Sequence, residues 1–171
     1  MRAPGSGART RESPTSSWGD IASARVLEVL VRNLDGMVFG CALDAAWTMH
    51  FVSPGCQELT GYTAAELIGN SAISYERVIH PDDRASVREI VQAAVADGTG
   101  YRIEYRIRCK SGDHKWLRER GRAVADETGD EVLEGFVEDI SDQVAAQHRL
   151  LDAELRYRSI FENSVIGIFQ T

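Results

Sequence analysis

The chain has 171 residues, of which 43% are hydrophobic, enough for one domain of ordinary size with its own apolar core. Its 26 Asp and Glu residues outnumber its 19 Lys and Arg residues, and the net charge of -7 argues against a protein that binds nucleic acid by neutralising phosphates. The three cysteines, Cys41, Cys56 and Cys109, form no Cys-x-x-Cys pair, so they indicate reduced thiols in a cytoplasmic protein and not a zinc or thiol-exchange site.

The first 19 residues are rich in Gly, Ser, Pro and Arg, a composition typical of a disordered tail. No apolar run follows their arginines, so we expect neither a secretory signal nor an anchor. No later stretch approaches the roughly 18 to 20 apolar residues of a membrane span, and we expect no membrane contact within this chain. Residues 20–35 are predicted to form an amphipathic helix, because Asp20 can cap it, apolar residues follow on one stripe and Gly36 can end it.

Two short strands and two short helices are predicted next. The stretches "MVFGCAL" (37–43) and "WTMHFVS" (47–53) are strand-like and close enough for a hairpin, although residues 44–46 between them have weak turn chemistry. Residues 54–69 are typical of two short helices, the second of which has a capping box formed by Thr63 and a glutamate three residues later.

The segment "VIHPDDRASV" places a histidine beside two aspartates and raises the question of a metal or acid–base site. A helix start explains the same residues. Pro81 suits the first helical position, and Asp82 and Asp83 would lie in the first turn, where the helix dipole favours negative charge. We therefore predict a helix from Pro81 to about Asp97, with His80 serving its start.

Three long strands are predicted after this helix. Residues 101–109 alternate between Tyr, Ile or Cys and charged side chains, as a half-buried strand does, and residues 116–126 and 132–140 follow it after polar turns. Strands and helices do not alternate strictly, which predicts an α+β domain with an antiparallel sheet. Because Glu104 and Glu119 interleave with the arginines of these strands, we expect the arginines on a solvated sheet face.

The C-terminal part is predicted to be mainly helical. Residues 141–161 lack Gly and Pro and are dense in good helix formers, and their apolar residues and His148 begin a heptad spacing, so we expect a short two-stranded coiled coil. Residues 162–171 form an apolar strand-like run with no partner, and we expect the coding region to continue beyond it.

These pieces in this order resemble the PAS family of sensory domains, in the subclass whose long helix starts with "HPDD". The segment "EDIS" resembles the family's terminal Asp-Ile-Thr signature, where the sheet is followed by a signalling helix. The last segment, "YRSIFENSVIGIFQT", resembles the opening of another PAS domain. The matching stretches, which cover about residues 35–141, are "LDGMVFGCALD", "FVSPGCQELTGYTAAELIGN", "VIHPDDRASV", "YRIEYRIRCKSGDHKWLRERGRAV" and "LEGFVEDIS".

The resemblance implies a five-stranded antiparallel sheet with short helices across one face, a small apolar pocket between them, and amphipathic terminal helices that pair two subunits. The PAS domain would cover residues 36–140, followed by a linker or signalling helix at 141–161 and the truncated start of a second PAS domain at 162–171. Trp116 and Gly135 match family positions that maintain the fold, the first as a core side chain and the second by allowing a close approach.

The same resemblance indicates where a signal would be received and passed on. The signal hand-over is expected at Asp139, Ile140 and Ser141. The candidates for the ligand pocket lie on the long helix and on the inner sheet face, and they are Val87, Val91, Val95, Tyr105, Ile107, Leu117 and Val137.

No cofactor is predicted, although an unknown small apolar ligand stays possible in principle. Blue-light PAS domains carry a reactive cysteine where this chain has Ala72, which excludes a flavin photoadduct on this alignment. Their flavin also meets amide side chains at the positions that correspond to Ile107, Leu117 and Val137 in this chain. Polar ligand atoms that face these apolar side chains would lack hydrogen-bond partners, at a cost of roughly 1–3 kcal/mol each. Haem-binding members commonly use a histidine within the long helix, which holds none here, and no pair of histidines has metal-ligand spacing.

Two functions stay open at this point. The first is a sensory and dimerisation module of a bacterial-type receptor, which senses a small ligand or relays a signal to a downstream PAS domain and an output domain, such as a sensor histidine kinase of a two-component system or a diguanylate cyclase. The second is a ligand-free spacer or protein-docking PAS domain, which a tightly filled core would favour. An enzyme complete within these residues is not expected, since the chain has no nucleophile motif, phosphate loop or paired acid–base constellation.

Overall fold

The structure is a computed structural model that describes residues 25–126 and 128–168, with side chains described up to residue 158. The chain divides into two units, residues 1–33 and residues 34–171. In the first unit residues 25–32 are helical, which agrees with the helix predicted there, and Arg32 forms an ion pair with Glu28 one turn earlier. The predicted disordered tail, residues 1–19, lies outside the described residues.

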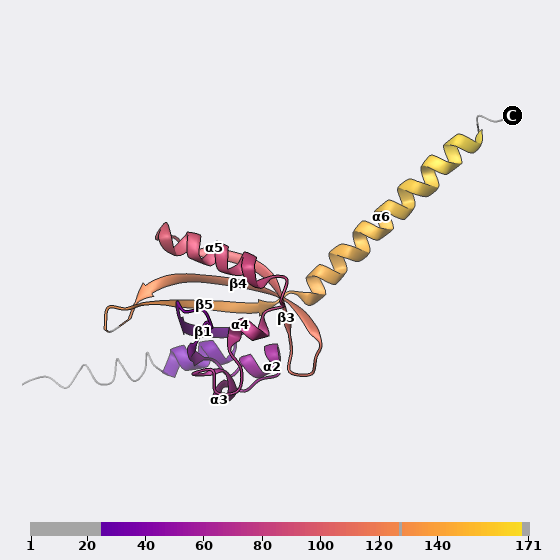
Figure 1. Cartoon of the computed structure of the whole chain (residues 1–171). Helices are drawn as coiled ribbons and strands as arrows, with labels where there is room; N and C mark the ends of the chain where they lie inside the picture. The colour runs from indigo at the N-terminus through magenta and orange to yellow at the C-terminus, as the bar shows by residue number, and fades with distance from the viewer. Residues whose placement is uncertain (1–24, 127, 169–171) are drawn as a thin grey trace, which may run out of the picture. The chain divides into compact units, whose positions relative to one another are not determined.

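The second unit is built on a five-stranded antiparallel sheet with the strand order β2-β1-β5-β4-β3 (Figure 1). The predicted α+β class, the five predicted strands and the antiparallel sheet are confirmed. The strands are β1 (Met37–Ala42), β2 (Met49–Val52), β3 (Tyr101–Arg108), β4 (His114–Ala125) and β5 (Glu131–Asp139).

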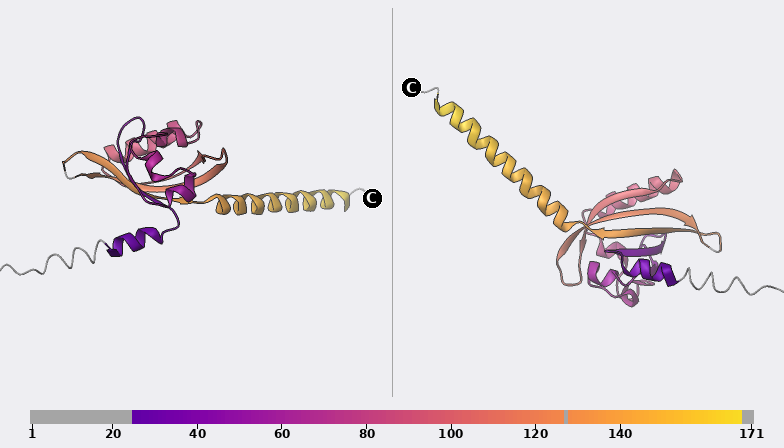
Figure 2. Two further views of the ribbon diagram at one scale, coloured as in Figure 1. Left: turned by 90° about the horizontal axis from the view of Figure 1, so that it is seen from below. Right: turned by 180° about the vertical axis from the view of Figure 1, so that it is seen from behind.

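Four helices cover one face of this sheet, and Figure 2 shows them on the same side. They are α2 (Cys56–Thr60), α3 (Ala64–Leu67), α4 (Tyr75–Val78) and α5 (Arg84–Ala96). The predicted capping box is present, because the Thr63 backbone N–H and hydroxyl both donate to the Glu66 carboxylate. Helix α4 was not predicted, since its four residues are too few to show a helical period.

Helix α5 starts later than predicted, at Arg84 and not at Pro81, so Asp82 and Asp83 do not lie in its first turn. The Asp83 carboxylate instead accepts hydrogen bonds from the backbone N–H of Arg106 (2.8 Å) and from its guanidinium (3.0 and 2.5 Å). Hydrogen bonding from Arg106 holds the pKa of Asp83 below its usual range. The "HPDD" segment therefore fastens the start of α5 to β3.

Trp116, which was predicted to be a core side chain, lies on the outer face of the sheet. This side chain is half-buried beside Arg106, whose guanidinium lies 5.7 Å from the centre of the indole ring, and it is not part of the core. Side chains alternate between the faces of β4, and Trp116 shares the outer face with its arginines, whereas Leu117 points inward and is fully buried.

The C-terminal helix α6 spans Ser141–Ile168 and is longer than the predicted 141–161. The strand-like reading of residues 162–168 was wrong, because these residues continue the helix, and residues 169–171 lie outside the described part. A second PAS domain starting there stays a prediction. Within the described part of the chain, no helix combines the length and apolarity needed to cross a bilayer.

Two paired glycines shape the inner face of the sheet. Gly121 on β4 is opposite Gly135 on β5, and their outer neighbours in the same row are Tyr101 and Phe39. A Cβ added at Gly135 would lie 2.8 Å from the Phe39 ring and 2.4 Å from the Arg120 carbonyl oxygen, and one added at Gly121 would lie 2.4 Å from the Tyr101 hydroxyl. The glycines therefore let both aromatic rings lie against the sheet, as expected at Gly135.

This packing predicts that Gly135→Ala lowers the free energy of unfolding by about 1–3 kcal/mol, because a backbone carbonyl and a ring must both move. Gly40→Ala is the matched control, since a Cβ there meets only Phe51 Cβ at 3.9 Å. We expect the control to change stability by no more than about 0.5 kcal/mol. Urea unfolding of both variants measures the difference, and equal effects would show that the close approach at Gly135 carries no cost.

Candidate functional site

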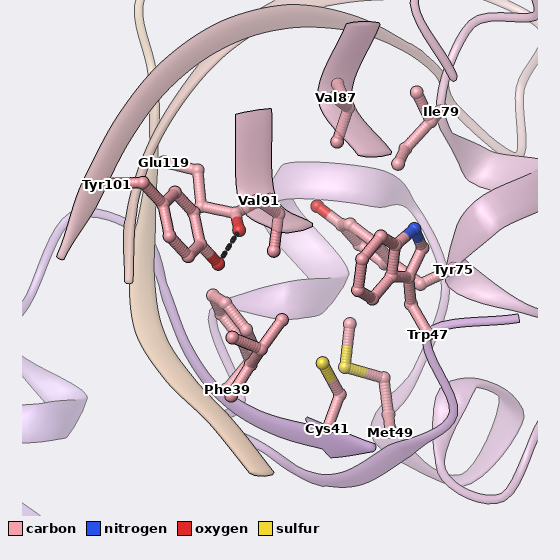
Figure 3. Close-up of a pocket in the computed structure, with 11 residues that line it drawn as sticks. Phe39, Cys41, Trp47, Met49, Tyr75, Ile79, Val87, Val91, Tyr101 and Glu119 are labelled. Carbon is pink, nitrogen blue, oxygen red and sulfur yellow. Dashed lines mark hydrogen bonds between the residues drawn. The ribbon is translucent and has the colours of Figure 1, made fainter. Parts of the chain in front are cut away.

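A cavity lies between the sheet and helices α4 and α5, and Figure 3 shows the side chains around it. The volume of the cavity that is open to the centre of a water molecule is about 20 Å³. This is room for about one water molecule or a group of that size. All five strands contribute to the wall. The lining residues are Phe39, Cys41, Trp47, Met49, Tyr75, Ile79, Val87, Val91, Tyr101, Glu119 and Leu133.

The structure brings only part of the predicted pocket set to this cavity. Val87 and Val91 line it from α5, whereas Val95, one turn further on, is half-buried and packs against the core. The other four candidates are fully buried on the inner face of the sheet but do not line the cavity, and they are Tyr105, Ile107, Leu117 and Val137. The alternation of apolar and polar residues predicts the inner face for these residues correctly. It does not predict which part of that face borders the cavity and which part is covered by helices.

Glu119 is the charged residue of the cavity wall, and the prediction that it lies among the surface arginines was wrong. It is only 6% exposed, because it shares the inner face of β4 with Leu117, while Arg118 on the outer face pairs with Glu104 at 2.9 Å. On this part of β4 the odd-numbered side chains point into the interior and the even-numbered side chains point outward. The parity of the strand was the sequence signal that could have placed Glu119 inside.

Three tyrosines form a hydrogen-bonded cluster around this carboxyl group. The Tyr101 hydroxyl donates to Glu119 Oε1 (2.7 Å), and the Tyr105 hydroxyl donates to Oε2 (2.5 Å). The hydroxyls of Tyr75 and Tyr105 are 3.0 Å apart. Because Tyr105 has already donated its one proton to Glu119, Tyr75 is the donor in this last bond.

Burial sets the protonation behaviour of the cluster. It raises the pKa of the Glu119 carboxyl above its ordinary value of 4.5, although the hydrogen bonds from Tyr105 and Tyr101 act in the opposite direction. Burial, followed by the nearby Glu119 charge, also raises the pKa of Tyr75, Tyr101 and Tyr105, so these three phenols stay protonated. Burial raises the pKa of the Cys41 thiol to about 12, which keeps it from acting as a thiolate nucleophile.

Trp47 is held over the cavity by the turn that the sequence predicted only weakly. The Asp44 carboxylate accepts hydrogen bonds from the backbone N–H groups of Ala46 and Thr48 and from the Thr48 hydroxyl. This turn places Trp47 in a left-handed conformation with φ of 52°, which is unusual for a bulky residue and places its ring in the cavity wall. One aspartate thus supplies the turn chemistry that the neighbouring alanines lack.

The predicted hand-over residues join the sheet to α6. The Trp116 backbone N–H donates to the Ser141 hydroxyl (3.0 Å), and the Ile140 N–H donates to the Trp116 carbonyl (2.8 Å). Asp139 accepts a hydrogen bond from the Ser141 N–H and forms an ion pair with Lys115. The start of α6 is therefore attached to β4 as well as to β5.

In the ranges that the structure describes, no group of three or more His, Cys, Asp and Glu side chains is placed to hold a metal ion. His80 and His114 lie with ring centres 5.2 Å apart, and the His80 backbone N–H donates to the Arg106 carbonyl, so His80 forms part of the attachment between α5 and β3.

Comparisons with known proteins agree with this architecture. The family described as PAS fold matches residues 49–137. The methyl sulfide methyltransferase-associated sensor of Methanosarcina acetivorans is 32% identical over 127 residues, covering 73% of this chain and 12% of that protein. The blue-light-activated histidine kinase of Brucella ovis is 30% identical over 127 residues, covering 70% and 24%. This chain therefore spans only a small part of the length of these relatives.

A solved structure supports the same assignment. The sensory box histidine kinase/response regulator from Burkholderia thailandensis superposes with a TM-score of 0.61 at 26% identity, covering 78% of this chain and 98% of that one.

The raised pKa of Glu119 predicts how stability depends on pH. The stabilisation that follows from this raised pKa is fully present below the pKa of 4.5 in the unfolded chain. It is lost as the pH rises through the higher pKa of the folded protein. The free energy of unfolding of the wild type, relative to Glu119→Gln, should therefore fall as the pH rises above about 4.5, with a slope of at most about 1.4 kcal/mol per pH unit. Denaturant unfolding of both proteins over this range measures the slope. A difference that does not change with pH would contradict the account.

Proposed function

The chain belongs to the PAS family, and from that premise we propose that it is the sensory module of a longer signal-transduction protein. A change in its interior cavity alters the attachment of α6, and α6 carries the change to the next domain. The observation that carries this proposal is the double attachment of Ser141, which follows β5 in the chain and accepts a hydrogen bond from the backbone of β4.

The cavity and the hand-over are connected through the same two strands. Glu119 lines the cavity from β4, three residues from Trp116, whose N–H and carbonyl both bind the start of α6. Leu133 lines it from β5, which leads directly into Ile140. In the proposed relay, a shift of β4 relative to β5 at the cavity changes the hydrogen bonds at Ser141. Such coupling needs two arrangements that a signal stabilises to different extents.

The partners of the module follow from α6 and from the relatives. Leu151 and Leu155 are 54% and 55% exposed, and one turn separates them on α6, as expected of a face that pairs with a second copy in a coiled coil. We propose a homodimer on this face, located in the cytoplasm, with the catalytic step in an output domain outside this chain. Similarity to a histidine kinase favours that class of output, and a diguanylate cyclase is the alternative.

A ligand-free spacer is the second candidate, and the small cavity favours it. Space for about one water molecule is far less than a flavin or haem occupies, and with Ala72 at the position of the reactive cysteine this supports a module without either group. In a spacer the same strands would relay movement from a neighbouring domain. The two candidates differ in whether the cavity receives a molecule, and they share the route through Ser141.

The relay is tested by truncating one cavity side chain. Val91→Ala removes two methyl groups from the wall, and we expect it to shift the backbone amide resonances of residues 141–144. Ile90→Ala is the matched control, because Ile90 is the preceding residue on α5 and is 42% exposed. Nitrogen–proton correlation spectra of the whole chain measure both effects.

The expected result is a clear shift of the α6 amides in Val91→Ala and none in Ile90→Ala. If the shifts in Val91→Ala stop at α5 and the cavity wall, the strands do not carry changes to α6 and the relay is refuted.

A further inference from the structure

The polar atoms that face the cavity are hydrogen-bond acceptors. Tyr101 has donated its single proton to Glu119, and Tyr75 has donated its proton to Tyr105, so both hydroxyls offer only lone pairs to a ligand. Each Glu119 oxygen accepts one hydrogen bond and keeps further acceptor capacity. The indole nitrogen of Trp47 lies on the side of its ring away from Glu119 (Figure 3). A molecule that satisfies this cavity must therefore donate hydrogen bonds.

The Glu119 carboxylate also lacks a counter-ion in the described part of the chain. Its partners there are two neutral phenols, and no Lys, Arg or His side chain forms an ion pair with it. Arg88 approaches the Trp47 ring at 4.7 Å, but its guanidinium donates to the carbonyls of Asp44 and Ala45. A buried carboxylate without a cation is costly, and a cationic ligand would remove that cost.

Aromatic rings form much of the remaining wall. Phe39, Trp47, Tyr75 and Tyr101 all line the cavity, and Figure 3 shows them around the space into which Glu119 points. The faces of such rings attract cations, most strongly when the cation is shielded from water. The rest of the wall is aliphatic or sulfur-containing and offers no strong donor to an anion.

The geometry of the cavity indicates which class of ligand it would bind, and this inference rests on the sensory function proposed above. We propose that the cavity binds a small organic cation, an ammonium group that carries a single carbon atom, through the Glu119 carboxylate and the surrounding aromatic rings. Its N–H groups donate to Glu119 and to the phenol oxygens, and its carbon contacts Val91 and the rings. The space, of which about 20 Å³ is open to the centre of a water molecule, limits the ligand to a nitrogen and one carbon atom bonded to it.

Methylammonium chloride is the probe for this proposal, and the whole chain is titrated with it at constant ionic strength against sodium chloride. We expect saturable shifts of the amide resonances around Glu119 and nuclear Overhauser contacts from the ligand methyl group to the Val91 methyls and the Trp47 ring. Glu119→Gln should weaken binding about tenfold or more, the change expected on losing a charge-assisted contact. Glu104→Gln, which removes a carboxylate from the outer sheet face, should leave the affinity unchanged.

Three results would overturn the ligand class: equal shifts with sodium, unchanged affinity in Glu119→Gln, or ligand contacts confined to the acidic surface. The contacts to Val91 and Trp47 are measured in the wild type, so the proposal stays testable if Glu119→Gln does not fold. Binding without any shift of the α6 amides would support the ligand class and refute the relay. No binding, together with the α6 shifts of Val91→Ala, would refute the ligand class and leave the relay in place.

Discussion

The burial of the Glu119 carboxyl group is the constraint on which the arrangement of the interior depends. A carboxyl group removed from water must keep its hydrogen bonds, and here the hydroxyls of Tyr101 and Tyr105 supply them. Tyr75 extends the chain from α4, so one polar cluster joins a helix to the two edge-side strands of the sheet. Removing one member would leave the polar atom that it binds unpaired in an apolar surrounding, which makes the cluster sensitive to changes in the cavity.

The backbone around the cluster is shaped to leave space beside it. Gly121 and Gly135 let Tyr101 and Phe39 lie against the sheet, and the Asp44 turn holds Trp47 in a left-handed conformation. These features give a cavity with one charged group and a largely aromatic wall, in a module in which β5 leads to Ser141 and β4 donates a hydrogen bond to it. The same strands therefore serve both the receiving site and the attachment of α6.

Much of this fold could be predicted from the sequence, because strands of six or more residues show their period of two directly. The long strands and the capping box at Thr63 were predicted for this reason. Helix α4 was missed because four residues show no period, and the strand-like reading of residues 162–168 failed because a short apolar run does not distinguish strand from helix. The predictions for Trp116 and Glu119 were wrong because they follow residue type, whereas the alternation along β4 places Trp116 on the outer face and Glu119 on the inner face. The cavity wall includes residues from α4 and from the turn at Trp47, whose positions depend on tertiary contacts that no local pattern contains.

Glu119 is a buried, hydrogen-bonded carboxyl group whose pKa burial raises above its ordinary value. A carbon-13 titration of the Glu119 side-chain carboxyl in the folded chain measures this directly. We predict a midpoint above 4.5 that moves when Tyr101 or Tyr105 is replaced by Phe. A midpoint at or below 4.5 that is unaffected by both replacements would show that the carboxyl group is solvated and does not lie in a closed cavity.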